Sequence, residues 1–309
     1  MQDISVIILT QNEEQHIARC IKSLLPFTDK IFVVDSGSTD NTIEIVENLG
    51  AKTLFNKWVN HSTQINVGIA ANPFNTKWLM RIDADEYVLP ELAEEINQTL
   101  HSIPDDTTGL YVKRRVFFMN KWIKHGGYYP IWLLRLWRNG AGICEDLWMD
   151  EHIKLLHGKA VQLKNDIVDN NLNNLTWWIQ KHNQYAILEM IVLLDTKYNF
   201  TDAQKVEARL FGTQDQRKRY LKLKYANLPL FTRPFVYFIF RFVFKLGFLD
   251  GTKGLIWHFL QGLWYRFLVD AKMYEMYHRV GKDRTAIIDY FKTEYGKDLL
   301  KLPNRPVEV

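Results

Sequence analysis

Short apolar runs of strand length alternate with segments of helical periodicity over the first hundred residues, and this alternation constrains the fold most strongly. The strand-like runs are ISVIILT (4–10), IFVVD (31–35), KTLF (52–55) and WLMRID (78–83). Helical patterns lie between and after them, at residues 12–25, 43–50, 64–71 and, following Pro90, 91–100. Such alternation is typical of parallel strands joined by right-handed helical crossovers. We therefore expect an α/β fold with a mostly parallel sheet flanked by helices.

The pattern changes after residue 109. The segments GLYVKRRVFFM (109–119) and WLLRLWR (132–138) alternate apolar and polar residues, as mixed or edge strands do. We expect one domain over residues 1–200, with halves 1–108 and 109–200. A separate region, residues 201–309, follows.

Three polar clusters follow the predicted strands at residues 10–13, 35–40 and 83–86. Ligands of open parallel sheets bind beyond the carboxyl ends of the strands, so these clusters should face one crevice. Asp35 can accept hydrogen bonds from a base or a sugar, and the small Ser-Gly-Ser loop after it lets the backbone approach a ligand. The alternative for this loop is a plain helix N-cap turn.

Asp83 and Asp85 form a D-x-D triplet at the end of a buried strand. With 20 Asp in 309 residues about one such triplet arises by chance, so its position carries the inference. Paired carboxylates suit Mg²⁺ or Mn²⁺, which bridge to substrate phosphates, whereas zinc favours His and Cys. Neither a G-x-G-x-x-G dinucleotide fingerprint nor a P-loop motif is present.

In this order, VIILTQNEE, VVDSGSTDNT, QINVG and WLMRIDADE resemble the family 2 glycosyltransferases, which have the GT-A fold and invert the anomeric centre. KHGGYYPIWLLRLWRNGAGICEDLWMDEHI and LTWWIQKHNQYAILE resemble the branch with lipopolysaccharide-core glucosyltransferases and other surface-polysaccharide enzymes. The resemblance covers residues 3 to about 190. It implies a GT-A-like domain with a donor half, 1–108, and an acceptor half, 109–200.

The resemblance also implies roles for individual residues. Asp35 would contact the nucleotide base, Asp83 the ribose and diphosphate, and Asp85 the metal. The expected donor-binding set is Thr10, Asn12, Glu13, Asp35, Ser36, Asp83, Ala84, Asp85, Arg135 and Arg138, and the expected metal set is Asp85, Asp83 and His152. Apart from the resemblance, Arg135 and Arg138 could clamp phosphates bidentately, with the alternative that one such arginine on an alternating strand simply faces solvent. For His152, an extra metal ligand or pyrophosphate contact, the alternative is an ordinary surface or core histidine.

The acidic motif MDEHI supplies the expected base. Glu151 stands at the position of the family's recurring carboxylate, whereas Asp150 replaces a histidine that related sequences often carry, so the assignment stays open between the two. Inverting transfer needs one carboxylate to accept the proton of the attacking hydroxyl. A metal ion neutralises the departing diphosphate, so no second acid is required. The alternative is an exposed acidic loop.

Trp177 and Trp178 fall on one predicted helix, where they form either core or a sugar-stacking platform. Lys181, His182 and Asn183 follow on the same helix and could point into an acceptor cleft.

Residues 203–309 explain the high aromatic share of 14% and carry most of the positive charge, with 20 Lys+Arg against 10 Asp+Glu, whereas the rest of the chain has a net charge of −6. In the apolar segment 228–249, Tyr237, Arg241 and Lys245 recur at four-residue steps. This narrow polar stripe predicts an amphipathic helix lying on an anionic membrane surface. A buried helical hairpin and a homo-oligomer interface remain alternatives. Nucleic acid is not expected, because the aromatics pack among aliphatics.

The two cysteines, Cys20 and Cys144, have no disulfide or metal spacing, and the first residues show no signal-peptide pattern. We therefore expect a peripheral protein on the cytoplasmic face of a bacterial inner membrane. The predicted activity is metal-dependent, inverting transfer of a hexosyl group from a nucleotide sugar, expected to be UDP-linked, to a lipid-carried saccharide. The alternatives are a non-catalytic membrane module that keeps the nucleotide-sugar fold, and a nucleotidyltransferase, which lacks its Gly-rich phosphate loop here.

Overall fold

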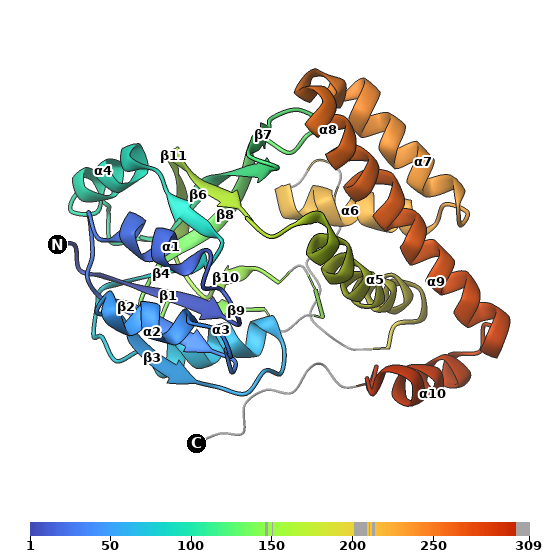
Figure 1. Cartoon of the computed structure of the whole chain (residues 1–309), viewed down its shortest axis with the longest axis horizontal. Coiled ribbons are helices and arrows are strands. Elements are labelled where there is room, and N and C mark those ends of the chain that lie inside the picture. The colour runs from blue at the N-terminus through green and yellow to red at the C-terminus, as the bar shows by residue number, and fades with distance from the viewer. Residues whose placement is uncertain (146–147, 150, 201–208, 210, 212–213, 301–309) are drawn as a thin grey trace. The chain divides into compact units, whose positions relative to one another are not determined.

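A computed structural model describes residues 1–145, 148–149, 151–200, 209, 211 and 214–300. The chain divides into two compact units, of which the first is Met1–Leu172 and the second begins at Asn173. The domain predicted from the sequence, residues 1–200, extends beyond this boundary. The helix at residues 175–198, which the prediction places in the first domain, belongs to the second unit. Figure 1 shows both units with their elements labelled.

The first unit is built on a mixed sheet with the strand order β3-β2-β1-β4-β8-β6-β11-β5, and β7 pairs with β6. Its four leading strands are parallel, as predicted, and the antiparallel pairs begin at β8, where the alternating pattern appears in the sequence. The α/β class is therefore confirmed. The strands are β1 (Ile4–Thr10), β2 (Ile31–Asp35), β3 (Lys52–Phe55), β4 (Trp78–Asp83), β5 (Glu86–Val88), β6 (Thr107–Phe118), β7 (Lys121–Ile123), β8 (Ile131–Arg138) and β11 (Lys159–Asn170).

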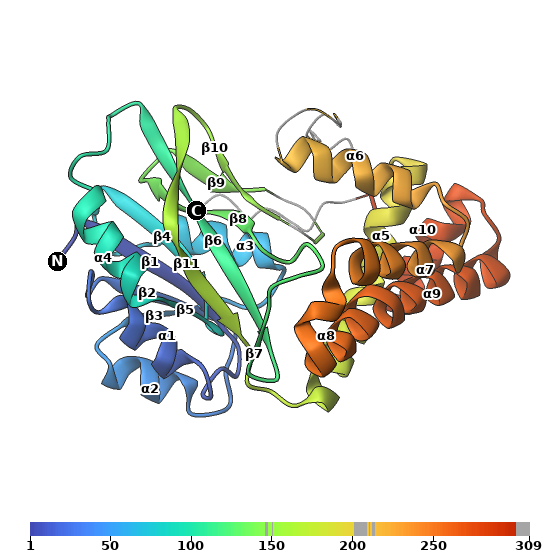
Figure 2. The same cartoon turned by 90° about the horizontal axis from the view of Figure 1, so that it is seen from above.

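Helices cover both faces of this sheet because the parallel strands are apolar on both sides (Figures 1 and 2). One core joins Ile4, Val6 and Ile8 to α1 (Ile17–Leu24), α2 (Thr42–Asn48) and α4 (Pro90–Thr99). On the other face, Ile7 packs with residues of β2 and α3 (His61–Ala70). A second sheet, β9 (Gly142–Cys144) with β10 (Ile153–Leu155), adds to that face.

The helix starts agree with the sequence prediction at Pro90 and differ from it at Asn12. Pro90 is the first residue of α4, as expected. Asn12 is not the N-cap of α1, which begins five residues later at Ile17. Asn12 instead adopts a left-handed backbone conformation (φ 58°), and its side-chain oxygen accepts a hydrogen bond from the Thr39 amide.

The second unit is helical in its described residues. Its elements are α5 (Leu175–Tyr198), α6 (Gln214–Ala226), α7 (Thr232–Ile239), η1 (Phe240–Phe244), η2 (Gly247–Asp250), α8 (Gly251–Trp257), η3 (His258–Trp264), α9 (Tyr265–Val280) and α10 (Arg284–Tyr295). In the described part of the chain, no helix has the length and apolar character needed to cross a bilayer.

A buried ion pair fixes the start of α7 to α9. Both side chains are about 1% exposed, and the Arg233 Nε donates to Asp270 Oδ1 at 2.8 Å. The second carboxylate oxygen, Oδ2, accepts a hydrogen bond from the Phe231 amide at 2.8 Å. One carboxylate on α9 therefore holds both the arginine and the backbone at the beginning of α7.

Candidate active site

Asp35 ends β2 and organises the loop that follows. Its Oδ1 accepts hydrogen bonds from Thr10 Oγ1 at 2.9 Å and from Ser38 Oγ at 2.5 Å. Its Oδ2 accepts from the amides of Gly37 and Ser38, both at 2.8 Å. Gly37 has φ +98°, which an L side chain rarely adopts. Both oxygens of the Asp35 carboxylate are therefore occupied by donors from Thr10 and from the loop after β2.

The other residues of the first two polar clusters tie the loops together. The Asn12 amide donates to Ser38 Oγ at 2.8 Å, and Ser36 Oγ accepts from the Gln64 side chain of α3 at 2.8 Å. Glu13 lies 2.7 Å from His16 Nδ1, and His16 Nε2 accepts from the Leu172 amide at 2.8 Å. His16 therefore carries its proton on Nδ1 and donates it to Glu13.

The third polar cluster and the acidic motif meet at Arg81. Its Nη2 lies 3.2 Å from Asp83 Oδ1, 3.2 Å from His61 Nδ1 and 3.9 Å from Glu151 Oε1. His61 Nδ1 is also 3.0 Å from Glu151 Oε1. These four residues, here called the Arg81 cluster, come from β4, the first turn of α3 and the segment before β10. Asp83 and Glu151, which the sequence assigns to donor and acceptor chemistry, are thus brought together.

Electrostatics keep both carboxylates of the Arg81 cluster ionised. Burial acts to raise the pKa of Glu151, but the hydrogen bond and charge of His61, with the charge of Arg81, lower it below its usual value. Burial also acts to raise the pKa of Asp83, yet Arg81, Arg135 and His61 hold it well below the usual range. Both side chains are therefore anions at neutral pH.

Arg135 is turned inward, toward Glu86. Its Nη2 donates to both carboxylate oxygens of Glu86, at 2.6 and 2.8 Å, and to Asp83 Oδ2 at 3.2 Å. Glu86 also accepts a hydrogen bond from the Asp83 amide at 3.0 Å. Burial, reinforced by Asp83 and Asp169, raises the pKa of Glu86 to about 7 despite the attraction of Arg135. The buried pair thus holds the Asp83 carboxylate in place.

Asp85 stands apart from this network. Its Oδ2 accepts a hydrogen bond from the Asn171 side chain at 3.0 Å, whereas its Oδ1 accepts none from the residues the structure describes. The Asp85 carbonyl accepts from Arg19 at 3.0 Å and from the Asn170 amide at 3.2 Å. Its backbone is therefore fixed while its half-exposed carboxylate keeps one oxygen available. The neighbouring Ala84 is buried.

Two expected site residues lie elsewhere. Arg138 pairs with Trp78, the first residue of β4, because β8 runs antiparallel to β4, so it is at the opposite end of that strand from Asp83. Its Nε donates to the Thr107 carbonyl at 2.9 Å. His152 is half-exposed in the segment between β9 and β10, and its Nδ1 lies 3.7 Å from Glu145 Oε2. Asp150, the other candidate base, lies outside the described residues.

The donor set fits a divalent cation only in part. Over the described ranges of the chain, no three His, Cys, Asp or Glu side chains gather as metal ligands. Mg²⁺ and Mn²⁺ are, however, often held by one or two carboxylates together with substrate phosphates. Asp85 has the available oxygen that this arrangement needs. Asp83 offers less, because each of its oxygens already contacts an arginine.

Sequence reasoning missed His61, Arg81 and the role of Glu86. Arg81 had a signal, because it lies two residues before Asp83 on the same strand and so points to the same face. His61 had none, since α3 reaches the site only through its packing in the folded unit.

Comparisons with known proteins show similarity to glycosyltransferases. The family model described as Glycosyl transferase family 2 matches residues 5–154. An uncharacterised glycosyltransferase of Rickettsia typhi is 28% identical over 89% of this chain and 88% of its own length. The lipopolysaccharide core biosynthesis glycosyltransferase LpsC of Rhizobium meliloti is 28% identical over 88% of this chain and 92% of its own.

Among solved structures, glucosyl-3-phosphoglycerate synthase of Mycobacterium tuberculosis, with Mn²⁺, UDP and glucosyl-3-phosphoglycerate, is 24% identical with a TM-score of 0.30. That likeness covers 37% of this chain and 44% of the synthase. The family match instead covers every residue of the first two polar clusters and the whole Arg81 cluster. Residues 5–154 of this chain are therefore a glycosyltransferase family 2 domain.

Proposed function

We propose that the chain transfers a sugar from a nucleoside-diphosphate sugar, UDP-linked, to a lipid-carried saccharide, with inversion at the anomeric carbon. The observation that carries this proposal is the Arg81 cluster, in which Asp83 and Glu151 converge on one guanidinium. A carboxylate for the proton and a cation for the diphosphate then lie side by side. The homology to LpsC supports a lipopolysaccharide or polysaccharide acceptor.

Donor binding is assigned to the loops after β1, β2 and β4. The backbone amides around Gly37 and the Thr10 hydroxyl surround Asp35, where the nucleotide base would bind. Arg81 is suited to the diphosphate, since a guanidinium binds phosphate oxygens through several donors. Its Nε is buried and donates no hydrogen bond to the described residues, so a phosphate oxygen could satisfy it.

Glu151 is the proposed base. Its Oε1 faces His61, while its Oε2 makes no hydrogen bond with the part of the chain that is described. An acceptor hydroxyl attacks the anomeric carbon as the bond to the diphosphate oxygen breaks, and its proton passes to Glu151. The electron pair of the broken bond leaves with the nucleoside diphosphate. Asp85 would hold Mg²⁺ or Mn²⁺, which when bound neutralises charge on the departing diphosphate.

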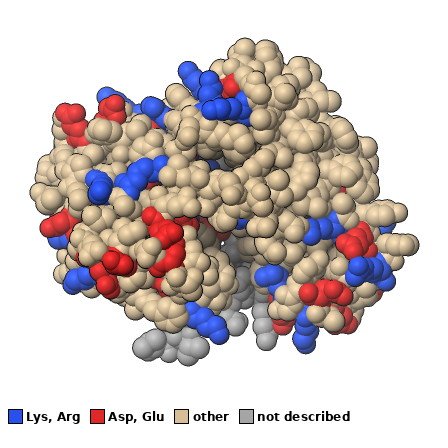
Figure 3. Space-filling model, viewed as in Figure 1, with Lys and Arg blue, Asp and Glu red and all other residues tan. Residues whose placement is uncertain are grey.

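Membrane association is proposed for the second unit. Large apolar side chains are 46 to 72% exposed along α7, η1, η2, α8 and η3: Phe235, Val236, Ile239, Phe240, Val243, Phe244, Leu246, Phe248, Leu249, Leu255 and Phe259. We call these residues the apolar face. Figure 3 shows a broad area without charged side chains over the part of this unit that contains α7–α9. Single exposed apolar residues are common, but a continuous set of this size marks an interaction surface.

Two residues of the predicted polar stripe, Tyr237 and Arg241, are half-buried against the unit, whereas the third, Lys245, is exposed. Arg241 Nη1 donates to Tyr237 Oη at 2.5 Å, and the guanidinium of Arg266 lies 5.4 Å from the Tyr237 ring centre. The apolar side is therefore directed away from the unit's own packing, which supports peripheral binding over a buried hairpin. The excess of basic residues in 203–309 favours an anionic bilayer, as at the cytoplasmic face of an inner membrane.

Donor turnover tests the function. Purified protein is given Mn²⁺ or Mg²⁺, a panel of nucleotide sugars and a lipopolysaccharide-core glycolipid, and release of nucleoside diphosphate is measured. We expect release with one donor, stimulated by the acceptor. Absence of release across the panel would favour a non-catalytic binding module, and release of pyrophosphate would indicate a nucleotidyltransferase.

A further inference from the structure

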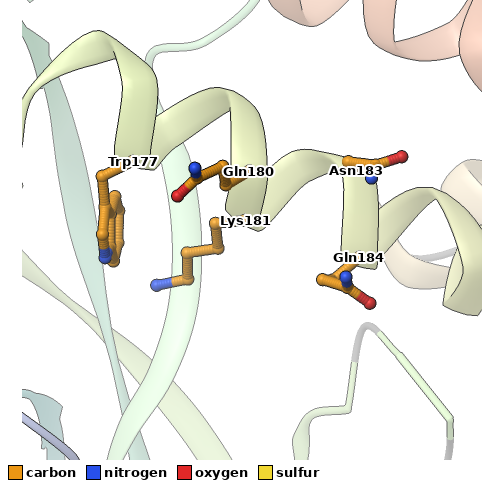
Figure 4. Close-up of a pocket in the computed structure, with 5 residues that line it drawn as sticks. All are labelled: Trp177, Gln180, Lys181, Asn183 and Gln184. Carbon is orange, nitrogen blue, oxygen red and sulfur yellow. The ribbon is translucent and has the colours of Figure 1, made fainter.

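The first half of α5 carries a polar stripe beside a cavity. Trp177, Gln180, Lys181 and Gln184 have the spacing i, i+3, i+4 and i+7, which places them on one side of a helix. Together with Asn183 they line a cavity of about 440 Å³. Figure 4 shows Trp177 and Lys181 extending in the same direction from the helix. We call these five residues the α5 stripe.

The neighbouring residues of α5 point into the core instead. Trp178 is 9% exposed, and its ring stacks on His182 with ring centres 3.5 Å apart. Burial lowers the pKa of His182 to about 4, so this imidazole is neutral. Trp178 and His182 therefore make the packing contacts of this part of α5. Packing does not account for the residues of the α5 stripe.

The chemistry of the α5 stripe matches a saccharide. The Trp177 indole is half-buried and offers an apolar surface for the C–H face of a sugar ring. Gln180, Asn183 and Gln184 make no hydrogen bonds to other described residues, so their carboxamides can donate to and accept from vicinal hydroxyls.

One cation completes the stripe. Lys181 Nζ lies 4.5 Å from the Trp177 ring centre, and none of the five lining residues is acidic. A single ammonium suits one anionic substituent on a sugar. A nucleoside diphosphate, with two phosphates, is a poorer match.

We propose, building on the function proposed above, that the α5 stripe binds the saccharide chain of the acceptor, with a sugar ring on Trp177 and a phosphate or carboxylate substituent at Lys181. This assigns acceptor recognition to the second unit, whereas the donor loops belong to the first.

The test measures binding to the full chain by calorimetry, without donor. The probe is deacylated lipopolysaccharide core oligosaccharide, either untreated or treated with phosphatase. We expect Trp177→Ala to weaken binding of both probes about tenfold, and Trp177→Phe to restore part of it. Lys181→Ala should weaken binding of the untreated probe about fivefold, whereas Lys197→Ala, on the last turn of the same helix, should change nothing.

Two outcomes would overturn the proposal. If Trp177→Ala binds the oligosaccharide within twofold of wild type, the proposed stacking site is wrong. If Lys181→Ala and wild type bind the untreated probe equally, the proposed anionic contact is wrong. Circular dichroism verifies that each variant is folded. Donor turnover is measured in parallel on the same proteins. If the protein turns over donor but Trp177→Ala does not change oligosaccharide binding, the proposed function stands and the α5 stripe proposal fails. If oligosaccharide binds through Trp177 but no donor is turned over, the binding site stands and the proposed enzymatic function fails.

Discussion

Arg81 stands between Asp83 and Glu151, 3.2 Å from the first carboxylate and 3.9 Å from the second. Carboxylates this close to one another would each resist ionisation if no cation separated them. The guanidinium therefore allows two anions to share a site where a third, the diphosphate, is proposed to bind. Displacement of Arg81 toward that diphosphate would also free Glu151 to accept a proton.

Glu151→Gln should lower kcat by a factor of about 10²–10⁴, because the amide cannot accept the proton of the acceptor hydroxyl. Affinity for the nucleotide sugar should stay within about threefold, since the substitution removes the base and not a donor contact. Steady-state kinetics and donor titration check both values. The matched control is Glu47→Gln, an exposed position on α2. Full activity of Glu151→Gln would transfer the role to Asp150.

His61→Ala should move the acidic limb of the pH–rate profile to higher pH. His61 supplies the leading interactions that lower the pKa of Glu151, so without it the carboxylate protonates at a higher pH and activity is lost sooner on acidification. The profile of kcat/KM between pH 4 and 8 is the measurement. His101→Ala, at an exposed histidine of the same unit, should leave the limb in place. Identical limbs for His61→Ala and wild type would contradict the coupling.

Asp85→Asn should remove metal-stimulated turnover, with a loss of about 10²-fold or more, while leaving the fold intact. Binding of Mn²⁺ in the presence of UDP, followed by electron paramagnetic resonance, provides a readout independent of turnover. Asp29→Asn, at an exposed loop position, serves as the control. Near wild-type Mn²⁺ binding in Asp85→Asn would exclude this carboxylate as a ligand.

Glu86 should make the protein less stable as pH rises from about 4.5 to about 7. Burial raises its folded-state pKa to about 7, so in this window the folded state binds a proton that the unfolded state has released. The free energy of unfolding from this group then falls by at most ~1.4 kcal/mol per pH unit. Urea unfolding at pH 5, 6 and 7 measures the slope. Glu86→Gln cannot titrate and should give a flatter profile; an unchanged slope would assign the dependence to other groups.

Replacing Phe240 and Phe244 together by Ser should reduce binding to anionic liposomes about tenfold or more. The double substitution removes two aromatic rings of the apolar face, which are 49% and 72% exposed. Cosedimentation with vesicles of anionic and of neutral lipid measures the effect. Phe55→Ser removes a 69% exposed ring from the first unit and should change nothing. If the double variant turned a dimer into a monomer without altering liposome binding, the apolar face would be an interface between copies.

The sequence predicts the first hundred residues well because the four parallel strands there are short and apolar and alternate with clear helical patterns. Pro90 marks the start of α4 and Gly50 follows the end of α2, both through backbone preferences that act locally. Arg138 shows the limit of this reasoning. Its position in the sequence suggests a partner for Arg135, but the antiparallel register of β8 sends it to the far end of β4.

Pairings over long distances explain the remaining differences. The partnership of Arg135 with Glu86, and of His61 with Glu151, depends on which strands become neighbours, and no local pattern encodes that order. The split between Trp177 and Trp178 has the same origin, since adjacent helical residues point about 100° apart and only tertiary packing decides which is buried.

The Asp270 carboxylate at the start of α7 restricts which substitutions this region can accept. Because Oδ1 receives Arg233 and Oδ2 receives the Phe231 amide, exchanging the two charges would restore an ion pair but leave that amide without an acceptor. In homologous chains that keep the apolar face, we therefore expect the residues at positions 233 and 270 to change together, as polar or apolar pairs. We do not expect the acidic and the basic residue to exchange places. The Phe231 backbone amide, rather than a side chain, therefore requires the acidic residue of this ion pair to be on α9 and the basic residue on α7.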